Sequence, residues 1–325
     1  MIYYKRKLKE KSKNYEYYTI DDKKLEDKNI LDKIKKIYIP PAYKNVKIYL
    51  KKDLLATGIN SMGRKQYIYS DYSKQKREFK KYNMLINLSK NINKLKNKMK
   101  KDLLLKDFTK NKLIALILKI MDLCNFRSGS KKYEKKYGSY GLTTLHKDHV
   151  KITNKSVKIE FIGKKKVNNQ CIIQNKNIQD LIQKIYNLSS KDNSYLFSII
   201  YHNEKINVSI LDVNNYLEEF NITTKDLRTW NANIIFLKNF KKEIEKLDNS
   251  YYELDHNKKL KIVKKIIKKS IEKCALLLHH TPTICKSSYI YKKIIENIEN
   301  NYEDIINKIT GKKVIWEKIL ENIMK

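Results

Sequence analysis

Glycine, proline, tryptophan and cysteine are scarce in this chain of 325 residues, which contains seven, three, two and four of them. The cysteines lie far apart and match no metal-ligand spacing, so we expect reduced, chemically inert thiols in an intracellular compartment. They are Cys124, Cys171, Cys274 and Cys285. No stretch approaches the roughly 18 apolar residues of a membrane span, and the N-terminus has no apolar signal core. The sequence therefore predicts a protein that is neither inserted in a membrane nor secreted.

Cofactor motifs are missing as well. The sequence has neither a glycine-rich phosphate-binding loop of the Walker type nor an H-E-x-x-H zinc motif. ATP and zinc chemistry therefore have no signature in this chain, and we predict that it uses no cofactor and no obligatory metal.

Acidic residues are in the minority. The chain has 71 Lys and Arg against 35 Asp and Glu, which gives a formal net charge of +36. A compact protein with so large a charge repels itself and is usually matched by a polyanion, so nucleic acid is the first partner to consider and a membrane surface the second. Apolar residues make up 41% of the chain, which argues against disorder.

Arginine is rare among the basic residues. The abundance of Lys, Asn, Ile and Tyr suggests an AT-rich coding sequence in which Arg drifts to Lys wherever a point charge is enough. The arginines that remain are candidates for sites that need a rigid, bidentate fork for phosphate or carboxylate. The five are Arg6, Arg64, Arg77, Arg127 and Arg228. For Arg6, chance retention at the surface is the simpler explanation.

Charge and hydrophobic pattern divide the chain into residues 1–77 and residues 78–325, which carry +12 and +24. Short β-branched and aromatic runs predict an antiparallel sheet in the first part. Three such runs are Ile37–Ile39, Val46–Tyr49 and Gln66–Tyr69. The second part is mostly of helical periodicity. We therefore expect an α+β protein with a small N-terminal β domain, residues 1–77, and a larger, mainly helical domain, residues 78–325.

Several elements of the second part can be placed. Apolar residues recur every three or four positions from Leu103 to Met121 and from Leu260 to Leu278, which predicts two core helices. Between them, residues 150–173 read as strands, with a turn at residues 163–166 that places Lys164 on the tip of a hairpin. Residues 294–325 suggest two helices broken near Gly311. The lysine-rich run of residues 90–112 fits a phosphate-facing helix or a solvated face equally well.

Four short motifs carry the candidate catalytic residues. They are N-F-R-S-G at 125–129, F-I-G-K at 161–164, K-D-L-R-T-W at 225–230, and H-T-P at 280–282 with Tyr289 nine residues after the histidine. Taken alone, each is weak. In this order they resemble the catalytic pentad of the small type IB DNA topoisomerases of poxviruses and bacteria. The first part resembles that family too, in I-P-P-A-Y at 39–43, A-T-G-I-N at 56–60 and G-R-K-Q-Y-I-Y at 63–69.

The resemblance spans roughly residues 30–295 and implies a reaction. Enzymes of this family attack one strand of duplex DNA with a tyrosine, which forms a 3′-phosphotyrosyl bond and frees a 5′-hydroxyl. The bond energy is kept in the adduct, so the strand is resealed after swivelling without ATP. The nucleophile should be Tyr289, of which only about 0.1% would be phenolate at pH 7 if its pKa were the ordinary one. Its rival, Tyr291, lacks the spacing from His280.

The resemblance also assigns the other members of the pentad. Arg127, Arg228 and His280 would stabilise the negative charge that gathers on the phosphate oxygens in the transition state. Lys164 would be the general acid that protonates the leaving 5′-oxygen. Because Lys165 and Lys166 follow directly, the alignment with the family leaves open which of the three lysines is the general acid. The acidic residue that many relatives have just after this lysine is absent. His279 aligns with no motif position and reads as an ordinary polar histidine.

Duplex DNA is the partner that the resemblance implies, held by a monomer that closes around it as a clamp. Family DNA contacts are matched by Gln66, Tyr67, Tyr69, Tyr133, Lys225 and Asn233. A glutamine suits the edge of a purine in the major groove, whereas strand packing explains the tyrosines of the N-terminal part equally well. We expect Tyr289 at the start of a helix or in a flexible segment after His280. If the source is a poxvirus, which the composition would suit, a place in the virion core and infected-cell cytoplasm is implied.

Two alternatives have different consequences. A tyrosine site-specific recombinase shares the order of catalytic residues and the fold of the catalytic part, but it normally has a helical N-terminal domain. A noncatalytic, basic DNA-binding or packaging protein would account for the charge of +36. It gives no reason for the five residues of the pentad to occur at these spacings.

Overall fold

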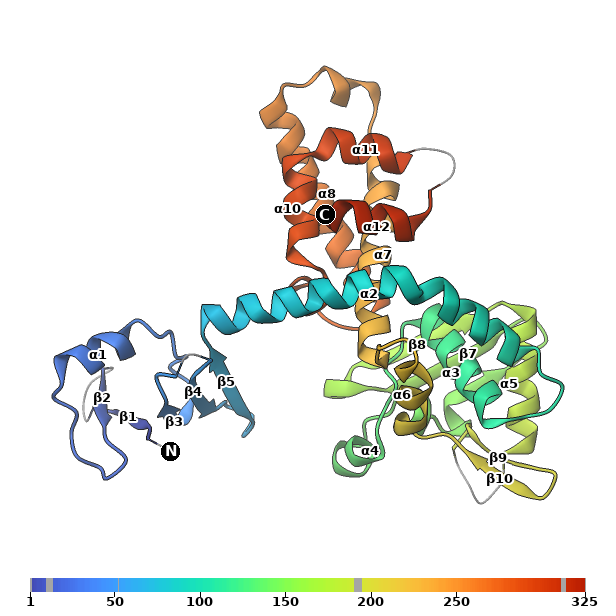
Figure 1. Ribbon diagram of the computed structural model, residues 1–325, viewed down its shortest axis with the longest axis horizontal. Coiled ribbons are helices and arrows are strands. Elements are labelled where there is room, and N and C mark those ends of the chain that lie inside the picture. The colour runs from blue at the N-terminus through green and yellow to red at the C-terminus, as the bar shows by residue number, and fades with distance from the viewer. Residues whose placement is uncertain (1, 10–13, 52, 190–194, 311–313, 325) are drawn as a thin grey trace. The chain divides into compact units, whose positions relative to one another are not determined.

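The computed structural model describes residues 2–9, 14–51, 53–189, 195–310 and 314–324 (Figure 1). The chain divides into two compact units, residues 1–81 and 82–325. The predicted boundary after residue 77 falls within helix α2 (Asp71–Leu103), which begins in the first unit and continues into the second. The first unit is built on an antiparallel sheet and the second is mainly helical, so the predicted α+β class is confirmed.

The sheet of the first unit has five antiparallel strands in the order β2-β1-β3-β4-β5. They are β1 (Tyr4–Leu8), β2 (Tyr15–Tyr18), β3 (Lys44–Ile48), β4 (Leu54–Ile59) and β5 (Lys65–Tyr69). Helix α1 (Lys28–Lys35) begins where the Asp27 carboxylate accepts hydrogen bonds from the first-turn amides. Alternate residues of β3, Val46 and Ile48, are buried against Ile34 of this helix. Ile68 of β5 packs against the same small core.

One of the three strand predictions in this unit is wrong. The runs that contain Val46 and Tyr67 lie in β3 and β5, but residues 37–39 form no strand. The Ile37 amide instead bonds to the Ile34 carbonyl and closes the last turn of α1. The two prolines that follow have no amide hydrogen for a ladder, which explains why the chain stays irregular there.

The second unit is a group of helices with two small sheets. The helices are α2 from residue 82 onward, α3 (Lys110–Cys124), α4 (Lys131–Tyr137), α5 (Lys176–Leu188), α6 (Ile210–Glu218), α7 (Thr224–Ile244), α8 (His256–Leu277), α9 (Pro282–Ile284), α10 (Lys292–Asn300), α11 (Tyr302–Thr310) and α12 (Trp316–Met324). One sheet has the order β6-β7-β8, with β6 (Val150–Ile152), β7 (Val157–Ile162) and β8 (Asn168–Ile173). The other pairs β9 (Ser198–Tyr201) with β10 (Glu204–Asn207). None of the described helices is long and apolar enough to span a membrane.

Helix α3 is the centre of the core, because nearly all of its residues from Leu113 to Met121 are buried. The prediction of a helix from Leu103 onward is wrong at its start. Helix α2 ends at Leu103, and α3 begins only at Lys110, where the Thr109 hydroxyl accepts a hydrogen bond from the Lys112 amide. The helix predicted at 260–278 is confirmed as α8.

The predicted hairpin is confirmed as β7 (Val157–Ile162) and β8 (Asn168–Ile173), with β6 (Val150–Ile152) on the other side of β7. Val157, Ile159 and Phe161 share the buried face of β7. The turn between the strands contains Lys164, as the sequence predicts.

The C-terminal stretch is more finely divided than predicted. Residues 294–310 belong to two helices, α10 and α11, because the chain breaks at Asn301, and α12 follows. The predicted break at Gly311 lies outside the described residues. Figure 1 shows α10, α11 and α12 gathered on α7 and α8, the two long helices that lead to the site.

Glu243, near the end of α7, is a nearly buried carboxylate that holds α7 to α8. It pairs with Lys269 at 2.7 Å and with Lys273, both on α8, and with Lys246 at 2.6 Å. Hydrogen bonds from these three ammonium groups lower its pKa to about 2 from 4.5. Because the folded protein holds this carboxylate ionised, the pairing contributes to stability above about pH 4.5 and is lost as the pH falls toward 2.

We therefore expect Glu243→Gln to lower the free energy of unfolding at pH 7 by about 2 kcal/mol, because three charge-assisted hydrogen bonds are weakened together. Glu253→Gln is the matched control, since Glu253 is exposed. Urea unfolding at several pH values measures both. The difference between Glu243→Gln and the parent should shrink below pH 4.5, and a difference that does not depend on pH would contradict this assignment.

Candidate active site

Tyr289 ends a helical turn that the fold holds in place. The Thr281 hydroxyl caps α9, Pro282 occupies its first position, and residues 285–289 continue as one π-helical turn. The expectation that Tyr289 begins a helix is therefore wrong, because it ends one, and the alternative of a flexible segment stays a prediction. The side chain is half-buried, and the Cys285 carbonyl that accepts the Ile290 amide fixes the end of the turn.

Two arginines meet at the Tyr289 hydroxyl, Arg127 from the loop after α3 and Arg228 from α7. The Arg127 Nη2 donates to it at 3.5 Å and the Arg228 Nε at 3.4 Å. Arg228 is 4% exposed, and its two terminal nitrogens donate to the carbonyls of Asn125 and Leu278. Its guanidinium is thus fixed by protein carbonyls on one side while Nε points to the phenol.

Electrostatics favour the anionic form of this tyrosine. Burial alone would raise the pKa of Tyr289, but the positive charges and hydrogen bonds of Arg228 and Arg127 outweigh it, so the pKa lies below its ordinary value of 10. Burial, followed by repulsion from Arg127, lowers the pKa of Arg228 to about 10, which leaves it charged at neutral pH. The pair therefore offers two positive charges to a phenolate or another anion.

His280 lies against the same phenol. Its ring stacks on that of Tyr289 with centroids 4.8 Å apart, and Nδ1 donates to the Thr281 carbonyl at 3.3 Å. The Nε2 atom is buried and has no hydrogen-bond partner among the described residues. Burial and the neighbouring Arg228 lower the pKa of His280 to about 4, so the ring is neutral at pH 7. An uncommitted nitrogen thus belongs to a ring that stacks on the phenol.

Close packing of two glycines shapes the loop that carries Arg127. Gly129 has φ +89°, and a Cβ on Gly141 would lie 2.5 Å from the Gly129 backbone and 2.7 Å from the Arg127 carbonyl. Only glycine fits this crossing, which the hydrogen bond from the Leu142 amide to the Arg127 carbonyl closes at 3.0 Å. The glycines in this chain are few, and these two fix the position of Arg127.

Lys164 comes from a different element, the turn between β7 and β8. It is exposed on the β7–β8 turn and has no hydrogen bond or ion pair with the part of the chain that the structure describes. A side chain at the preceding position would have to displace Asn169, because a Cβ on Gly163 would lie 2.4 Å from the Asn169 amide nitrogen. Asn169 in turn donates to the Val167 carbonyl at 2.8 Å. The turn is therefore shaped by its backbone, while the lysine side chain is left uncommitted.

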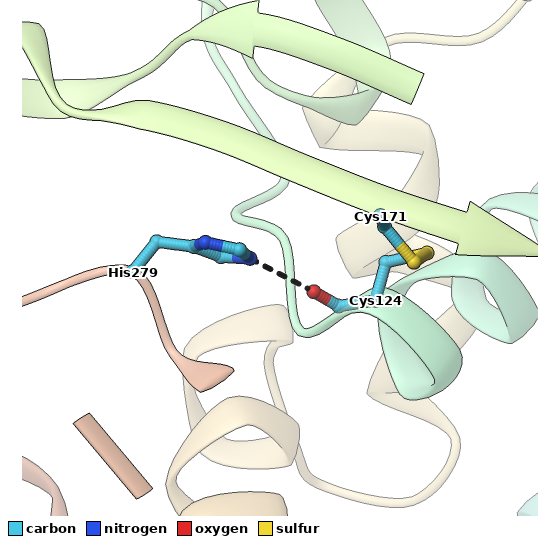
Figure 2. The surroundings of a disulfide bond; sticks show 3 residues. All are labelled: Cys124, Cys171 and His279. Carbon is cyan, nitrogen blue, oxygen red and sulfur yellow. Dashed lines mark hydrogen bonds between the residues drawn. A yellow bond between two sulfur atoms is a disulfide. The ribbon is translucent and has the colours of Figure 1, made fainter. Parts of the chain in front are cut away.

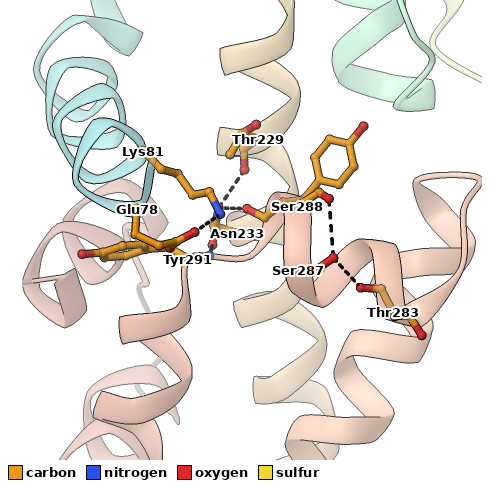
Figure 3. Close-up of polar contacts among 9 residues, drawn as sticks. Glu78, Lys81, Thr229, Asn233, Thr283, Ser287, Ser288 and Tyr291 are labelled. Carbon is orange, nitrogen blue, oxygen red and sulfur yellow. Dashed lines mark hydrogen bonds and ion pairs between the residues drawn. The ribbon is translucent and has the colours of Figure 1, made fainter. Parts of the chain in front are cut away.

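Asn233 has a different place from the one that the sequence suggests. It is fully buried, and its amide nitrogen donates to the carbonyls of Thr229 at 2.7 Å and Tyr289 at 3.1 Å, while its oxygen accepts the Tyr291 amide at 3.0 Å. Figure 3 shows Asn233 beside this part of the chain. The side chain holds the backbone on both sides of Ile290, and its burial does not support the predicted DNA contact.

The remaining predicted DNA contacts lie on accessible surfaces of their units. In the first unit, Tyr67 is exposed, its ring stacks with that of Tyr69 at 6.3 Å, and Gln66 on the same strand is half-buried. In the second unit, Tyr133 is exposed on α4 and Lys225 is exposed on the first turn of α7. Each of these residues has atoms available to a ligand, and their roles stay predictions.

The prediction of four reduced thiols is wrong for two of them. Cys124 at the end of α3 and Cys171 on β8 form a disulfide, 47 residues apart in sequence (Figure 2). His279, which the sequence left as an ordinary polar residue, bonds through Nε2 to the Cys124 carbonyl at 3.2 Å. No spacing rule could have found either contact, because both depend on how β8 and the end of α8 meet α3. Cys274 and Cys285 are free and buried.

Side chains that commonly bind metal ions form no cluster in the described part of the chain. Among residues 2–9, 14–51, 53–189, 195–310 and 314–324, no three His, Cys, Asp or Glu side chains form a group that could hold a metal ion. The chemistry that the site offers is an activated phenol beside two guanidiniums and an imidazole.

Known proteins resemble this chain over most of its length. The family described as eukaryotic DNA topoisomerase I, catalytic core, matches residues 70–315, and the N-terminal domain of bacterial DNA topoisomerase IB matches residues 14–60. DNA topoisomerase 1B of Acanthamoeba polyphaga mimivirus is 31% identical over 302 residues, which cover 89% of this chain and 86% of the relative. DNA topoisomerase 1B of vaccinia virus (strain Copenhagen) is 29% identical over 263 residues, 79% of this chain and 76% of the relative.

The electrostatics of the site can be tested at His280. We expect its ring protons in a proton NMR titration to move at about pH 4, below the ordinary pKa of 6.5, because burial and Arg228 disfavour the imidazolium. His280→Gln identifies the resonance. Replacing Arg228 with Met should raise this pKa, and a parent value near 6.5 would contradict the described surroundings.

Proposed function

Because the chain belongs to the type IB DNA topoisomerases, we propose that Tyr289 is the nucleophile with which it opens and reseals one strand of duplex DNA. The observation that carries this assignment is the convergence of Arg127 and Arg228 on the Tyr289 hydroxyl. A tyrosine used only for packing would not need two guanidiniums at its hydroxyl, whereas a nucleophilic phenol does, because its reactive form is the anion.

The attack conserves the energy of the phosphodiester bond. The Tyr289 oxygen forms a bond to the scissile phosphorus, the bond to the 5′-oxygen breaks, and a 3′-phosphotyrosyl adduct and a 5′-hydroxyl result. After the free strand has rotated, the 5′-hydroxyl attacks the same phosphorus and releases the tyrosine. No ATP and no metal enter this sequence of steps.

Arg127, Arg228 and His280 stabilise the transition state. In this proposal the Arg127 guanidinium and the Nε side of Arg228 donate to the non-bridging phosphate oxygens, and loss of one such donor typically costs about 100-fold to 1000-fold in rate. The buried Nε2 of His280 is the third donor. Because Nδ1 already donates to the Thr281 carbonyl, His280 takes up a proton as the anionic phosphate arrives and raises its pKa.

Lys164 is the general acid. Its ammonium group has no ion pair with the described residues, and the exposed turn that carries it can reach a ligand bound at the surface. Protonation of the leaving 5′-oxygen needs such a group, since an alkoxide is a poor leaving group at neutral pH. Lys165 and Lys166 have positive φ values of 63° and 59°. Their backbone therefore differs from that of Lys164, and the assignment to the first lysine of the turn rests on its place directly after Gly163 in the motif.

Duplex DNA is the substrate, and we propose that a single chain closes its two units around it. Gln66, Tyr67 and Tyr69 of the first unit, and Tyr133 and Lys225 of the second, contact the duplex. Most of the charge of +36 then serves a salt-sensitive grip on phosphates. Asn233 supports the Tyr289 turn from behind instead of touching DNA. An enzyme that acts on DNA works inside cells or, if viral, in the virion core and infected-cell cytoplasm.

Supercoil relaxation tests the nucleophile. In EDTA and without ATP, the parent protein should relax both positive and negative supercoils, and Tyr289→Phe should form no covalent adduct and relax nothing while it keeps its duplex affinity, because only the attacking oxygen is lost. Tyr291→Phe is the matched control and should relax plasmid at the parent rate. An adduct that persists in Tyr289→Phe and disappears in Tyr291→Phe would move the nucleophile.

Leaving-group chemistry tests the general acid. Lys164→Ala should slow single-turnover cleavage about 100-fold or more on ordinary DNA, yet cleave at nearly the parent rate when the leaving group is a 5′-thiolate, which needs little protonation. Lys165→Ala and Lys166→Ala should cleave both substrates like the parent. If one of these two variants shows the thiolate rescue and Lys164→Ala does not, the general acid is that residue.

A further inference from the structure

Three segments that carry proposed catalytic residues meet at Cys124. Its sulfur is bonded to Cys171 of β8, and its carbonyl accepts a hydrogen bond from His279 Nε2 at 3.2 Å (Figure 2). Arg127 follows three residues later on the chain. His279 directly precedes His280, and Cys171 belongs to the strand that leaves the turn with Lys164.

We infer that His279 and the Cys124–Cys171 disulfide form a brace that positions the His280 segment and the Lys164 hairpin against the Arg127 loop. The inference rests on the proposed roles of these three residues. His279 and the bridge touch neither substrate nor reacting atoms in this proposal. They are positioning elements. This role explains two contacts that the proposed reaction does not itself use, the disulfide and the hydrogen bond from His279 to Cys124.

The bridge holds the hairpin at the edge where it is least supported. β8 is the outer strand of the order β6-β7-β8, so its other edge has no ladder partner among the described strands. Cys171 lies opposite Ile159, and the same ladder continues through Ile162 and Asn168 to the turn with Lys164. A covalent link at Cys171 therefore limits how far the hairpin can move relative to α3.

The ring of Phe126 joins the two halves of the brace. It packs edge-on against Phe161 of β7 with centroids 4.8 Å apart and lies 5.3 Å from the His279 ring. The Tyr140 amide also donates to the Ile162 carbonyl at 2.9 Å, next to the turn. These contacts tie β7 to the chain on both sides of Arg127 without the bridge, so loss of the bridge should loosen β8 and the turn with Lys164 while the Arg127 loop keeps its packing.

His279 controls where the chain goes after α8. Its φ is 52°, a left-handed conformation that turns the chain sharply, and the His280 amide bonds back to the Ala275 carbonyl at 3.1 Å. Burial lowers the pKa of His279, so the neutral ring donates one hydrogen bond to the Cys124 carbonyl. A side chain that cannot donate a hydrogen bond to the Cys124 carbonyl would leave that carbonyl unpaired. The position of the next residue, His280, would then be less firmly fixed.

Matched DNA substrates distinguish positioning from general stability. Single-turnover cleavage is measured on 5′-oxygen DNA and on 5′-thiolate DNA, with melting temperature and duplex affinity in a Tyr289→Phe background. The variants are Cys124→Ser/Cys171→Ser, His279→Ala and His279→Gln, with Cys274→Ser as the matched control for loss of a buried thiol. The parent is also measured after dithiothreitol has reduced the bridge to two thiols and has itself become a cyclic disulfide.

The bridge and His279 should give different signatures. Loss of the bridge, by mutation or reduction, should slow cleavage of 5′-oxygen DNA about tenfold and leave 5′-thiolate cleavage within about twofold of the parent, because only the general acid is misplaced. His279→Ala should slow both substrates about tenfold, and His279→Gln, whose Nε2 can reach the same carbonyl, should recover to within about threefold. Duplex affinity and Cys274→Ser should stay at parent values.

Other results would overturn the proposal. Equal slowing of both substrates by loss of the bridge, or no slowing at all, would remove its positioning role, as would alkylation of both Cys124 and Cys171 in protein purified without reductant. A His279→Gln variant as slow as His279→Ala would remove the role of His279. An error in the proposed function would give a different result. Lys164→Ala, made in the protein with the bridge intact, would then show no rescue on 5′-thiolate DNA.

Discussion

The site depends on one electrostatic constraint, which is that two guanidiniums must be held beside a half-buried phenol. Like charges repel, and a buried arginine loses its hydration, so the arrangement requires compensation. The compensation is local. The Arg228 terminal nitrogens are satisfied by the carbonyls of Asn125 and Leu278, which come from the ends of α3 and α8. Once these carbonyls are in place, the positive charge favours the phenolate form of Tyr289 and, in the proposed reaction, the anionic transition state.

Much of the second unit can be understood as support for this arrangement. α3 supplies a buried, rigid axis whose C-terminus sets Asn125 and Arg127, and α7 presents Arg228 and Asn233 to the Tyr289 turn. The Asn233 amide fixes the backbone of Tyr289 and Tyr291. The site is therefore built from helix ends and their carbonyls. Lys164 is the exception, since it stands on an exposed turn and is held only through the hairpin.

The sequence predicts the parts of this picture that depend on local pattern. The period of apolar residues places α8 and the β7–β8 hairpin, and the order of four motifs indicates the five residues of the pentad. Scarce glycines also mark real constraints, as the crossing of Gly129 and Gly141 shows. What the sequence misses depends on tertiary contacts. The burial of Asn233, the disulfide between residues 47 apart, and the bond from His279 arise only where α3, α7, α8 and β8 meet. The gap between α2 and α3 was missed because apolar residues continue through it, although Thr109 is a recognisable cap.

The most direct test of the central claim is to locate the covalent bond. The protein is trapped on a duplex substrate, digested with nuclease and trypsin, and the peptide of residues 287–292 is fragmented in a mass spectrometer. This peptide contains both Tyr289 and Tyr291, so fragmentation distinguishes them. The account predicts a nucleotide 3′-phosphate on Tyr289 in the parent protein. The same mass on Tyr291, or on a peptide elsewhere in the chain, would contradict it.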